Sequence, residues 1–169
     1  MRRFSIRLAR MSEARRIAVL SRDLIEAGLG WSWTPQRVMR SLRDRATNVV
    51  VAVDGQRVVA FALMKYLEEE AHLMLLAVLP TWRRAGVGRA MLAWLEETAL
   101  TAGICTIHLE VRANNRGARA FYRRFGFEEC ETLPGYYGGI EAALRMRSDL
   151  WENLSGRSAR GQAAWRPPT

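Results

Sequence analysis

The chain has few of the residues that build disulfide frameworks or metal sites. Its 169 residues include two cysteines, Cys105 and Cys130, and two histidines, His72 and His108. Two cysteines cannot form a disulfide framework, and their spacing is not that of metal ligands, so we interpret both as buried residues without a chemical role. With so few histidines, the sequence predicts no zinc site and no other metal site.

Long apolar segments are also missing. No apolar run is longer than that of residues 73–79, which is far shorter than the roughly 20 residues that a membrane-spanning helix needs. The basic N-terminus, residues 1–7, is not followed by an apolar stretch, so we do not expect a secretory signal. The sequence therefore predicts a cytoplasmic protein without a membrane partner.

Lysine is almost absent, although the chain is basic. Lys65 is the single lysine among 26 basic residues, which face 17 acidic ones and give a net charge of +9. This balance favours an anionic partner, such as nucleic acid, an acidic protein or a phosphate-rich cofactor. A genome-wide preference for arginine explains it equally well, so charge alone selects no partner. The 49% hydrophobic and 25% charged residues are typical of a globular domain.

Hydrophobic periodicity predicts one α/β domain with a mixed sheet. The expected strands are 4–7, 48–53, 58–64, 71–79, 106–111, 128–132 and 141–146, with a hairpin turn at Asp54-Gly55. The expected helices are 12–28 with Ser12 as N-cap, 34–42 beginning at Thr34-Pro35, 87–102, and one from Asn115 to Gly126. We expect 71–79 to be buried on both faces.

The two ends of the chain differ from this pattern. The domain is predicted over residues 1–150, and residues 151–169, rich in Ser, Gly, Arg and Pro, are predicted to be a flexible tail. Tyr136 and Tyr137 are expected in the loop between the last two strands.

The most informative segment is the turn between the apolar strand and the third helix. Residues 78–89 read Val-Leu-Pro-Thr-Trp-Arg-Arg-Ala-Gly-Val-Gly-Arg. Gly86 and Gly88 let the backbone approach a phosphate, whose charge is attracted by the free N–H groups of the helix N-terminus and by Arg83, Arg84 and Arg89. The turn lacks the Gly-Lys-Ser/Thr of a Walker loop and the third glycine of a dinucleotide fingerprint. A tight turn without a ligand is the alternative.

This turn resembles the acetyl-CoA motif of the GNAT superfamily of N-acetyltransferases, R/Q-x-x-G-x-G/A. A second match reads Leu-Glu-Val-Arg-Ala-Asn-Asn at 109–115 and Ala-Phe-Tyr-Arg-Arg-Phe-Gly-Phe at 120–127. It resembles the peptide N-terminal branch, particularly the bacterial ribosomal-protein-alanine acetyltransferases, and the resemblance spans about residues 48–147. It implies a single GNAT-type α/β (α+β) domain, with a mixed, mostly antiparallel central sheet flanked by about four helices.

The resemblance also implies roles for individual residues. Acetyl-CoA would be the co-substrate, and its binding residues would be Leu76, Ala77, Val78, Arg83, Arg84, Ala85, Gly86, Val87, Gly88, Arg89 and Asn115. Glu110 would act as base, directly or through a water, and Tyr122 would protonate the leaving sulfur; each role contributes on the order of 10² to 10⁴ in rate. The structural alternatives are a Glu110 that is solvated or salt-bridged, with Arg112 as the candidate partner, a core Tyr122 and an Asn115 that caps its helix.

The acceptor side is less well determined. By the same resemblance, Trp31, Trp33, Tyr136 and Tyr137 would flank the acceptor; the alternative is that they pin loops onto the core. The predicted function is transfer of an acetyl group to a primary amine, foremost a protein or peptide N-terminal α-amine, by direct attack in a ternary complex. A small-molecule amine or a lysine side chain is the first alternative, and a non-catalytic acetyl-CoA-binding module is the second. Scattered arginines argue against a nucleic-acid-binding protein; the chain is expected to be a monomer or homodimer.

Overall fold

The computed structural model describes residues 2–162 and contains one seven-stranded sheet in the order β1-β2-β3-β4-β5-β7-β6. All neighbouring strands are antiparallel except β4 and β5, which are parallel. The strands are β1 (Ser5–Leu8), β2 (Thr47–Asp54), β3 (Arg57–Tyr66), β4 (Ala71–Val78), β5 (Thr106–Arg112), β6 (Glu128–Tyr137) and β7 (Glu141–Asp149). The predicted mixed, mostly antiparallel sheet is confirmed.

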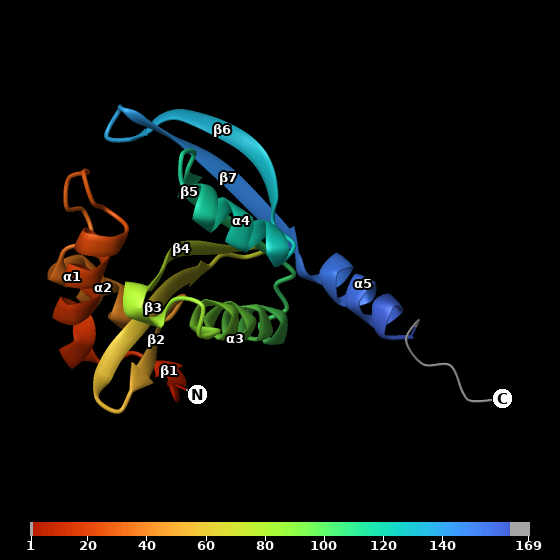
Figure 1. Ribbon diagram of the computed structural model, residues 1–169, viewed down its shortest axis with the longest axis horizontal. Coiled ribbons are helices and arrows are strands. Elements are labelled where there is room, and N and C mark those ends of the chain that lie inside the picture. Colours follow the sequence, from red (N-terminus) through yellow and green to blue (C-terminus); the bar gives the residue numbers. More distant parts are fainter. Residues whose placement is uncertain (1, 163–169) are drawn as a thin grey trace.

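Helices cover both faces of this sheet (Figure 1). They are α1 (Ala14–Leu24), α2 (Pro35–Arg43), α3 (Val87–Thr101), α4 (Arg116–Arg124) and α5 (Leu150–Gln162), with 3₁₀ turns η1 (Met11–Glu13) and η2 (Pro80–Trp82). Alternation along β2 divides its valines between two cores, because successive side chains of a strand point to opposite faces. Val51 packs with α1 and α2, whereas Val50 packs with α3 and α4.

Strand β4 changes its facing halfway along. Its pairing with β3 shifts by one residue, so that Leu63 lies opposite Leu75 while Met64 lies opposite Leu73. A bulge of this kind bends a strand and reverses which side chains face each core. Leu73 packs on the α3 and α4 side and Leu75 on the α1 and α2 side. The sequence had predicted that this strand is buried on both faces. That prediction is wrong, because buried and partly buried residues alternate along β4.

Strands β4 and β5 diverge soon after they meet. Their parallel register contains two residue pairs, Ala71 with Ile107 and His72 with His108. We call the segments beyond these pairs, residues 73–78 of β4 and 109–112 of β5, the β4–β5 fork. The edge of β4 that faces β5 therefore has no strand partner among residues 2–162 from Leu73 onward.

Helix starts follow the predicted capping chemistry in two of three cases. The Thr34 hydroxyl accepts from the Arg37 N–H with Pro35 in the first turn, and the Asn115 side chain accepts from the Ala118 N–H at 3.1 Å. Ser12 is not an N-cap, because a 3₁₀ turn precedes α1 and the Glu13 carboxylate accepts the Arg10 N–H at 2.8 Å instead.

The last two strands are longer than predicted. Strand β6 continues through Tyr137, so Tyr136 and Tyr137 lie on a strand and the chain reverses at residues 138–140. The prediction of a tyrosine loop is wrong because a register shift between Leu133 and Tyr137 lets the pairing resume beyond Pro134 and Gly135.

Helix α5 occupies much of the segment predicted to be a flexible tail, and it extends away from the sheet (Figure 1). Asp149 caps its first turn by accepting the N–H groups of Trp151 and Glu152, and Leu150 is buried. Residues 151–162 are thus helical, whereas residues 163–169 lie outside the described part, and the flexible tail stays a prediction. The domain boundary at 150 stays a prediction. None of the described helices is long and apolar enough to cross a membrane.

Candidate active site

The predicted phosphate-binding turn has the backbone conformation that its glycines suggested. Gly86 is the N-cap of α3 and has φ +79°, and Arg84 has φ +62°, in the left-handed region that side chains rarely adopt. The first bond inside the helix runs from the Ala90 N–H to the Gly86 carbonyl at 3.0 Å. The N–H groups of the three helical residues before Ala90 thus have no carbonyl of α3 to donate to, which makes this helix end suitable for an anion.

Gly88 lies where α3 comes closest to its neighbours. A Cβ at this position would lie 3.3 Å from the ring of Phe121 on α4 and 3.7 Å from Cγ2 of Val78 at the end of β4. The turn also carries three exposed guanidinium groups, those of Arg83, Arg84 and Arg89. A bare backbone surrounded by positive charge fits a diphosphate.

The β4–β5 fork leads to this turn. On one side, residues 76–78 of β4 pair with Ala60, Phe61 and Ala62 of β3. The opposite edge of the same residues lies beyond the last pair with β5, so its backbone groups are free to bind an extended ligand. Leu76, Ala77 and Val78, predicted to hold the arm of the coenzyme, line this edge together and are partly exposed.

Glu110 projects from β5 toward the side of the sheet that carries α1 and α2, and its side chain is 7% exposed. Its Oε2 accepts from Nε2 of His72 at 2.6 Å, and its Oε1 accepts from Nε and Nη2 of Arg145 at 3.2 Å. Arg145 is the direct cross-strand neighbour of Glu110 on β7. Glu110 is therefore salt-bridged, but the proposed partner Arg112 is wrong.

Arg112 points the same way and binds other groups. Its guanidinium donates to the carbonyl oxygens of Ile25 at 3.0 Å and Ala27 at 2.8 Å, and it lies 3.5 Å from the Glu141 carboxylate. These contacts fasten the segment between α1 and α2 to β5. Cross-strand neighbours, not residues two positions apart on one strand, decide the pairing.

The surroundings of Glu110 favour its ionised form. Burial raises the pKa of its carboxyl, but the hydrogen bond and charge of His72 and then the hydrogen bond of Arg145 lower it, and the net pKa lies below the usual value. A carboxylate that remains ionised is a proton acceptor.

The two histidines stand side by side at the last pair before the fork. The rings of His72 and His108 stack with centroids 4.3 Å apart and planes 16° apart. Nδ1 of His108 lies 3.4 Å from the Glu70 carboxylate. Burial, and then the charge of His72, lower the pKa of His108. This cluster was not predicted from the sequence, although His108 and Glu110 alternate correctly for one strand face.

Tyr122 comes from the other side of the sheet. It lies on α4, is buried, and its ring makes edge contacts with Phe121 and Phe127 at centroid distances of 5.2 and 5.4 Å. Burial, and then the proximity of Tyr137, raise the pKa of its phenol well above the usual value. The phenol is therefore protonated, as a proton donor must be, and the packing of its ring agrees with the core interpretation too.

Tyr136 and Tyr137 gather beside Glu110. Their rings meet edge to face at 4.9 Å, and the Arg112 guanidinium lies 5.9 Å from the Tyr137 ring. Burial, Tyr136 and then Glu110 raise the pKa of Tyr137 to about 12, and burial followed by Glu110 raises that of Tyr136. The charge of Glu110 thus acts on both phenols.

The tryptophans of the segment between α1 and α2 have different positions. Trp33 is 7% exposed, belongs to the core and stacks under the Arg37 guanidinium at 3.8 Å. Trp31 is 39% exposed, although its indole N–H donates to the Ala18 carbonyl at 3.2 Å. Trp33 thus fits the loop-pinning alternative, while Trp31 retains a surface for an acceptor.

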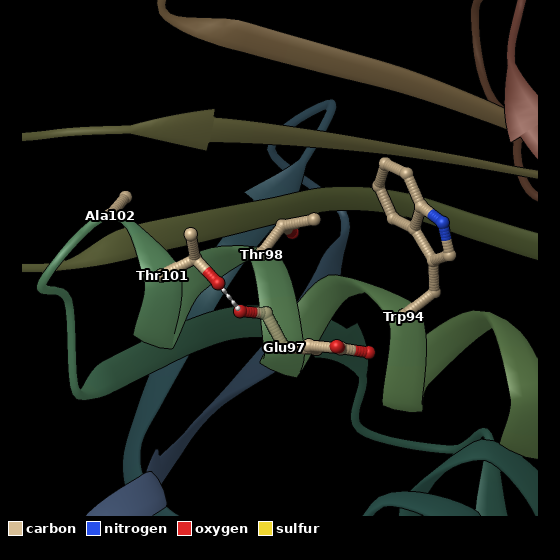
Figure 2. A pocket seen from close by; sticks show the side chains of 5 residues that line it. All are labelled: Trp94, Glu97, Thr98, Thr101 and Ala102. Carbon is tan, nitrogen blue, oxygen red and sulfur yellow. Dashed lines mark hydrogen bonds between the residues drawn. The ribbon is translucent and has the colours of Figure 1, made fainter.

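Two hollows lie away from the phosphate-binding turn. One, of about 410 Å³, lies along the second half of α3 and is lined by Trp94, Glu97, Thr98, Thr101 and Ala102 (Figure 2). None of these residues belongs to the two motifs found in the sequence. The Thr101 hydroxyl donates to the Glu97 carbonyl. The other hollow, of about 340 Å³, adjoins the histidines and is lined by Glu70, His108, Cys130, Arg145 and Arg147.

The cysteines differ from the prediction that both are buried. Cys130, in the lining of the smaller hollow, is exposed, and Cys105 is partly buried. The error for Cys130 has a simple cause, because β6 is an edge strand whose outer face is open to solvent.

Comparisons with known proteins agree with this geometry. Residues 17–127 match the acetyltransferase (GNAT) family. The [ribosomal protein bS18]-alanine N-acetyltransferase of Salmonella typhimurium is 35% identical over 117 residues, which cover 68% of this chain and 78% of the relative. The protein of that name from Escherichia coli K12 is 34% identical over the same shares.

Solved structures show the same fold. The ribosomal-protein-S18-alanine N-acetyltransferase from Escherichia coli superposes with a TM-score of 0.76 and 25% identity, covering 88% of this chain and 94% of that one. PaiA N-acetyltransferase from Thermoplasma acidophilum, solved in complex with coenzyme A, has a TM-score of 0.76 at 17% identity, covering 87% and 99%. The second likeness concerns the fold alone.

Proposed function

The chain belongs to the acetyltransferase (GNAT) family of N-acetyltransferases, and on this premise we propose that it acetylates a protein or peptide N-terminal α-amine by direct attack in a ternary complex. The observation that carries the proposal is the placement of an ionised carboxylate, Glu110, and a protonated phenol, Tyr122, on opposite sides of the β4–β5 fork. Base and acid reach the fork from separate directions, as an amine and a coenzyme arriving from opposite faces require.

Acetyl-CoA is the acetyl donor of this family and supplies the activated thioester. In our proposal, the free N–H groups at the start of α3 and the guanidinium groups of Arg83, Arg84 and Arg89 hold its diphosphate. The unpaired edge at residues 76–78 holds the amide-containing arm. Asn115 already caps α4 through its Oδ1, so its contact with the coenzyme would use the side-chain NH₂ group.

Glu110 takes a proton from the acceptor ammonium, directly or through one water, so that the free amine can attack the thioester carbon. His72 and Arg145 hold the carboxylate in place from two strands, which fixes the direction of its lone pairs. Holding the base in one orientation reduces the entropic cost of reaching the transition state.

Tyr122 acts on the leaving group. As the new C–N bond forms, the C–S bond breaks and the sulfur takes the phenolic proton. The raised pKa of Tyr122 keeps the proton on oxygen until the thiolate develops. The nitrogen loses two protons between ammonium and amide: Glu110 takes the first, and the second leaves as the C–N bond forms. One proton ends on the sulfur through Tyr122, whose phenolate is then reprotonated from solvent, so each turnover releases one proton net.

The acceptor class rests on the tyrosine pair and on the relatives. Tyr136 and Tyr137 stand next to Glu110, and Arg112 connects this region to the segment that carries Trp31. The relatives with 34–35% identity are named for acetylating an alanine of a ribosomal protein. A protein N-terminus is consistent with both observations, and a cytoplasmic location would follow from a ribosomal acceptor.

The test is an acceptor screen with coenzyme release as the readout. Peptides with free N-termini and an acetylated terminus, polyamines, and peptides with internal lysines are compared at equal concentration. We expect release with free N-termini and none when the terminus is blocked. Turnover of polyamines or blocked lysine peptides alone would replace the proposal by its first alternative, and coenzyme binding without turnover of any amine would support a binding module.

Two variants assign the chemistry. Glu110→Gln keeps the shape of the side chain and should lower kcat about 10²-fold or more, with coenzyme affinity nearly unchanged. Tyr122→Phe should slow turnover while the thermal midpoint stays close to that of the unmodified chain. Glu129→Gln is the matched control, since that carboxylate binds Arg119 on α4 and not the site. An unchanged rate in Glu110→Gln would remove Glu110 from the mechanism.

A further inference from the structure

We infer that His72, His108 and Glu110 form a binding site for a divalent metal ion of the zinc type, which inhibits the enzyme reversibly. One ligand atom from each residue lies within 4.8 Å of the others. The ion is no part of acetyl transfer, which needs no metal. The inhibitory effect rests on the proposed role of Glu110, but binding of the ion does not.

The sheet places the two imidazoles before any ion arrives. His72 and His108 are the last register pair of β4 and β5, and their rings are stacked 4.3 Å apart. Glu110 lies two residues further along β5 on the same face, with Oε2 2.6 Å from Nε2 of His72. The backbone of two paired strands therefore fixes all three ligands.

The donor set selects the class of metal. Imidazole nitrogen and carboxylate oxygen suit zinc and neighbouring late transition metals, and two histidines with one glutamate are a known three-ligand set that leaves a fourth position open. Zinc bonds of about 2.0–2.1 Å in tetrahedral geometry separate ligand atoms by about 3.4 Å. Binding therefore requires rotations about the side-chain bonds that widen the 2.6 Å separation of His72 and Glu110 and bring ligand atoms up to 4.8 Å apart closer together.

One ring nitrogen in the cluster lacks a hydrogen bond. Nδ1 of His108 is buried and has no hydrogen-bond partner among the described residues. Its nearest charged neighbour is the Glu70 carboxylate, at 3.4 Å. Coordination of an ion by either ring nitrogen gives His108 a fixed tautomer, and Glu70 can then orient the ring as an outer partner or fill the fourth position.

Charge and access are compatible with a cation. Arg145 is bound to Oε1 of Glu110, which leaves Oε2 for the ion, and its positive charge is offset by Glu131 at 2.9 Å. The hollow of about 340 Å³ beside His108 connects the cluster to the surface. An ion that enters there replaces the proton between His72 and Glu110, so Glu110 can no longer accept a proton from the amine.

Calorimetric titration of the untagged chain with zinc chloride tests the site. We expect one ion per chain and an affinity at least about tenfold lower in His72→Gln and in His108→Gln, because each removes a ligand. Cys130→Ser is the matched control, since its thiol lines the same hollow outside the ligand set, and it should bind zinc as tightly as the parent chain. Unchanged affinity in the double histidine variant, or loss of binding in Cys130→Ser, would place the ion elsewhere and overturn the inference.

A second measurement needs no variant. The chain contains two histidines, and both belong to this cluster. The imidazole signals in an NMR spectrum therefore report on this cluster alone. Zinc should shift both sets of signals together, and cobalt in its place should give the visible absorption of a four-coordinate nitrogen–oxygen site. Shifts in neither ring would contradict the inference even if the variants were unfolded.

The outcomes separate this inference from the proposed function. Acetyl transfer measured with excess EDTA tests the enzyme without the ion, and added zinc should then suppress it at the concentration that saturates the calorimetric site. Activity in EDTA without zinc binding leaves the function intact and refutes the site. Zinc binding at the histidines with full activity refutes the inhibitory role.

Discussion

The proposed donor side and the proposed acceptor side of this enzyme are built in different ways. Apart from Asn115, the proposed donor side is one continuous segment, from residues 76–78 of β4 through η2 to the first turn of α3, and it offers mainly backbone groups. The acceptor side consists of side chains from β4, β5, β6, β7 and the segment between α1 and α2. Backbone recognition depends on local conformation, whereas side-chain recognition depends on how distant strands are paired.

This difference implies that the two sides can be damaged separately. A change of backbone shape in the turn should affect the coenzyme and spare the acceptor. Loss of a cross-strand contact should do the reverse. The following substitutions test this independence, beginning with the largest expected effect.

Gly88→Val should remove most coenzyme binding. Its Cβ would lie 3.3 Å from Phe121, and its branched methyl groups would occupy the approach to the free N–H groups. We expect the coenzyme Kd to rise about a hundredfold, equivalent to ~2.7 kcal/mol, measured by calorimetry. Ala93→Val, on the exposed face of the same helix, controls for valine in a helix. A folded Gly88→Val chain with normal coenzyme affinity would refute the role of this turn.

Arg112→Met should loosen the acceptor side. It removes the donors to the carbonyl groups of Ile25 and Ala27, which should lower the free energy of unfolding by about 1–2 kcal/mol. The KM for the acceptor should rise while the coenzyme Kd stays constant. Arg57→Met, at the exposed hairpin turn, is the control. A raised coenzyme Kd in Arg112→Met would show that the two sides are coupled.

Glu13→Gln tests a contact outside both sides. The Glu13 carboxylate accepts from Arg7 at 2.6 and 3.0 Å and from the Arg10 N–H, and the hydrogen bond from Arg7 is the main reason that its pKa is lowered. A lowered pKa stabilises the fold above the unfolded value of 4.5, and this contribution is lost as the pH falls through the folded value. Urea unfolding should show a cost of about 1 kcal/mol at neutral pH.

The parent chain and the Glu13→Gln variant should have the same free energy of unfolding in acid, once Glu13 is protonated in both the folded and the unfolded state. Neither the coenzyme Kd nor the acceptor KM should change at neutral pH. A difference in stability that persists unchanged at a pH of about 3 would show that lost packing, not charge, causes the effect.

Arg84→Gly should have the smallest effect on stability, and in the favourable direction. Arg84 holds φ +62°, which costs a side chain about 1–2 kcal/mol, while glycine gives back about 0.5–1 kcal/mol of that in unfolded-state entropy. We expect a net gain of about 0.5 kcal/mol in urea unfolding. Coenzyme binding should weaken severalfold and become less salt-dependent, because one positive charge is lost. Unaltered salt dependence would mean that Arg84 does not meet the phosphates.

The sequence predicted those parts of the protein that local rules determine. The hairpin at Asp54-Gly55, the Thr34 and Asn115 caps and the glycine turn each depend on a few consecutive residues, and all are present. The helix over residues 150–162 was not predicted, because the Asp149 cap was overlooked. The predicted Ser12 cap is wrong, because a 3₁₀ turn precedes α1 and the Glu13 carboxylate accepts the Arg10 N–H at this helix start.

What the sequence could not give is the set of partners around Glu110. His72 reaches it from β4 and Arg145 from β7, and the register that brings them together depends on the whole sheet. The two histidines looked too few for a metal site when counted along the chain, yet parallel pairing of their strands sets them side by side. Contacts of this kind follow from topology, which a single sequence does not display.

The short pairing of β4 with β5 also bears on how the fold moves. Within the seven-stranded sheet of the described chain, only two residue pairs connect the four strands β1 to β4 with the three strands β5, β7 and β6. A coenzyme bound in the β4–β5 fork would replace the absent contacts between these two strands and make both groups of strands more rigid. Amide hydrogen exchange in β4 and β5 should then slow together on binding, far beyond the residues that touch the ligand.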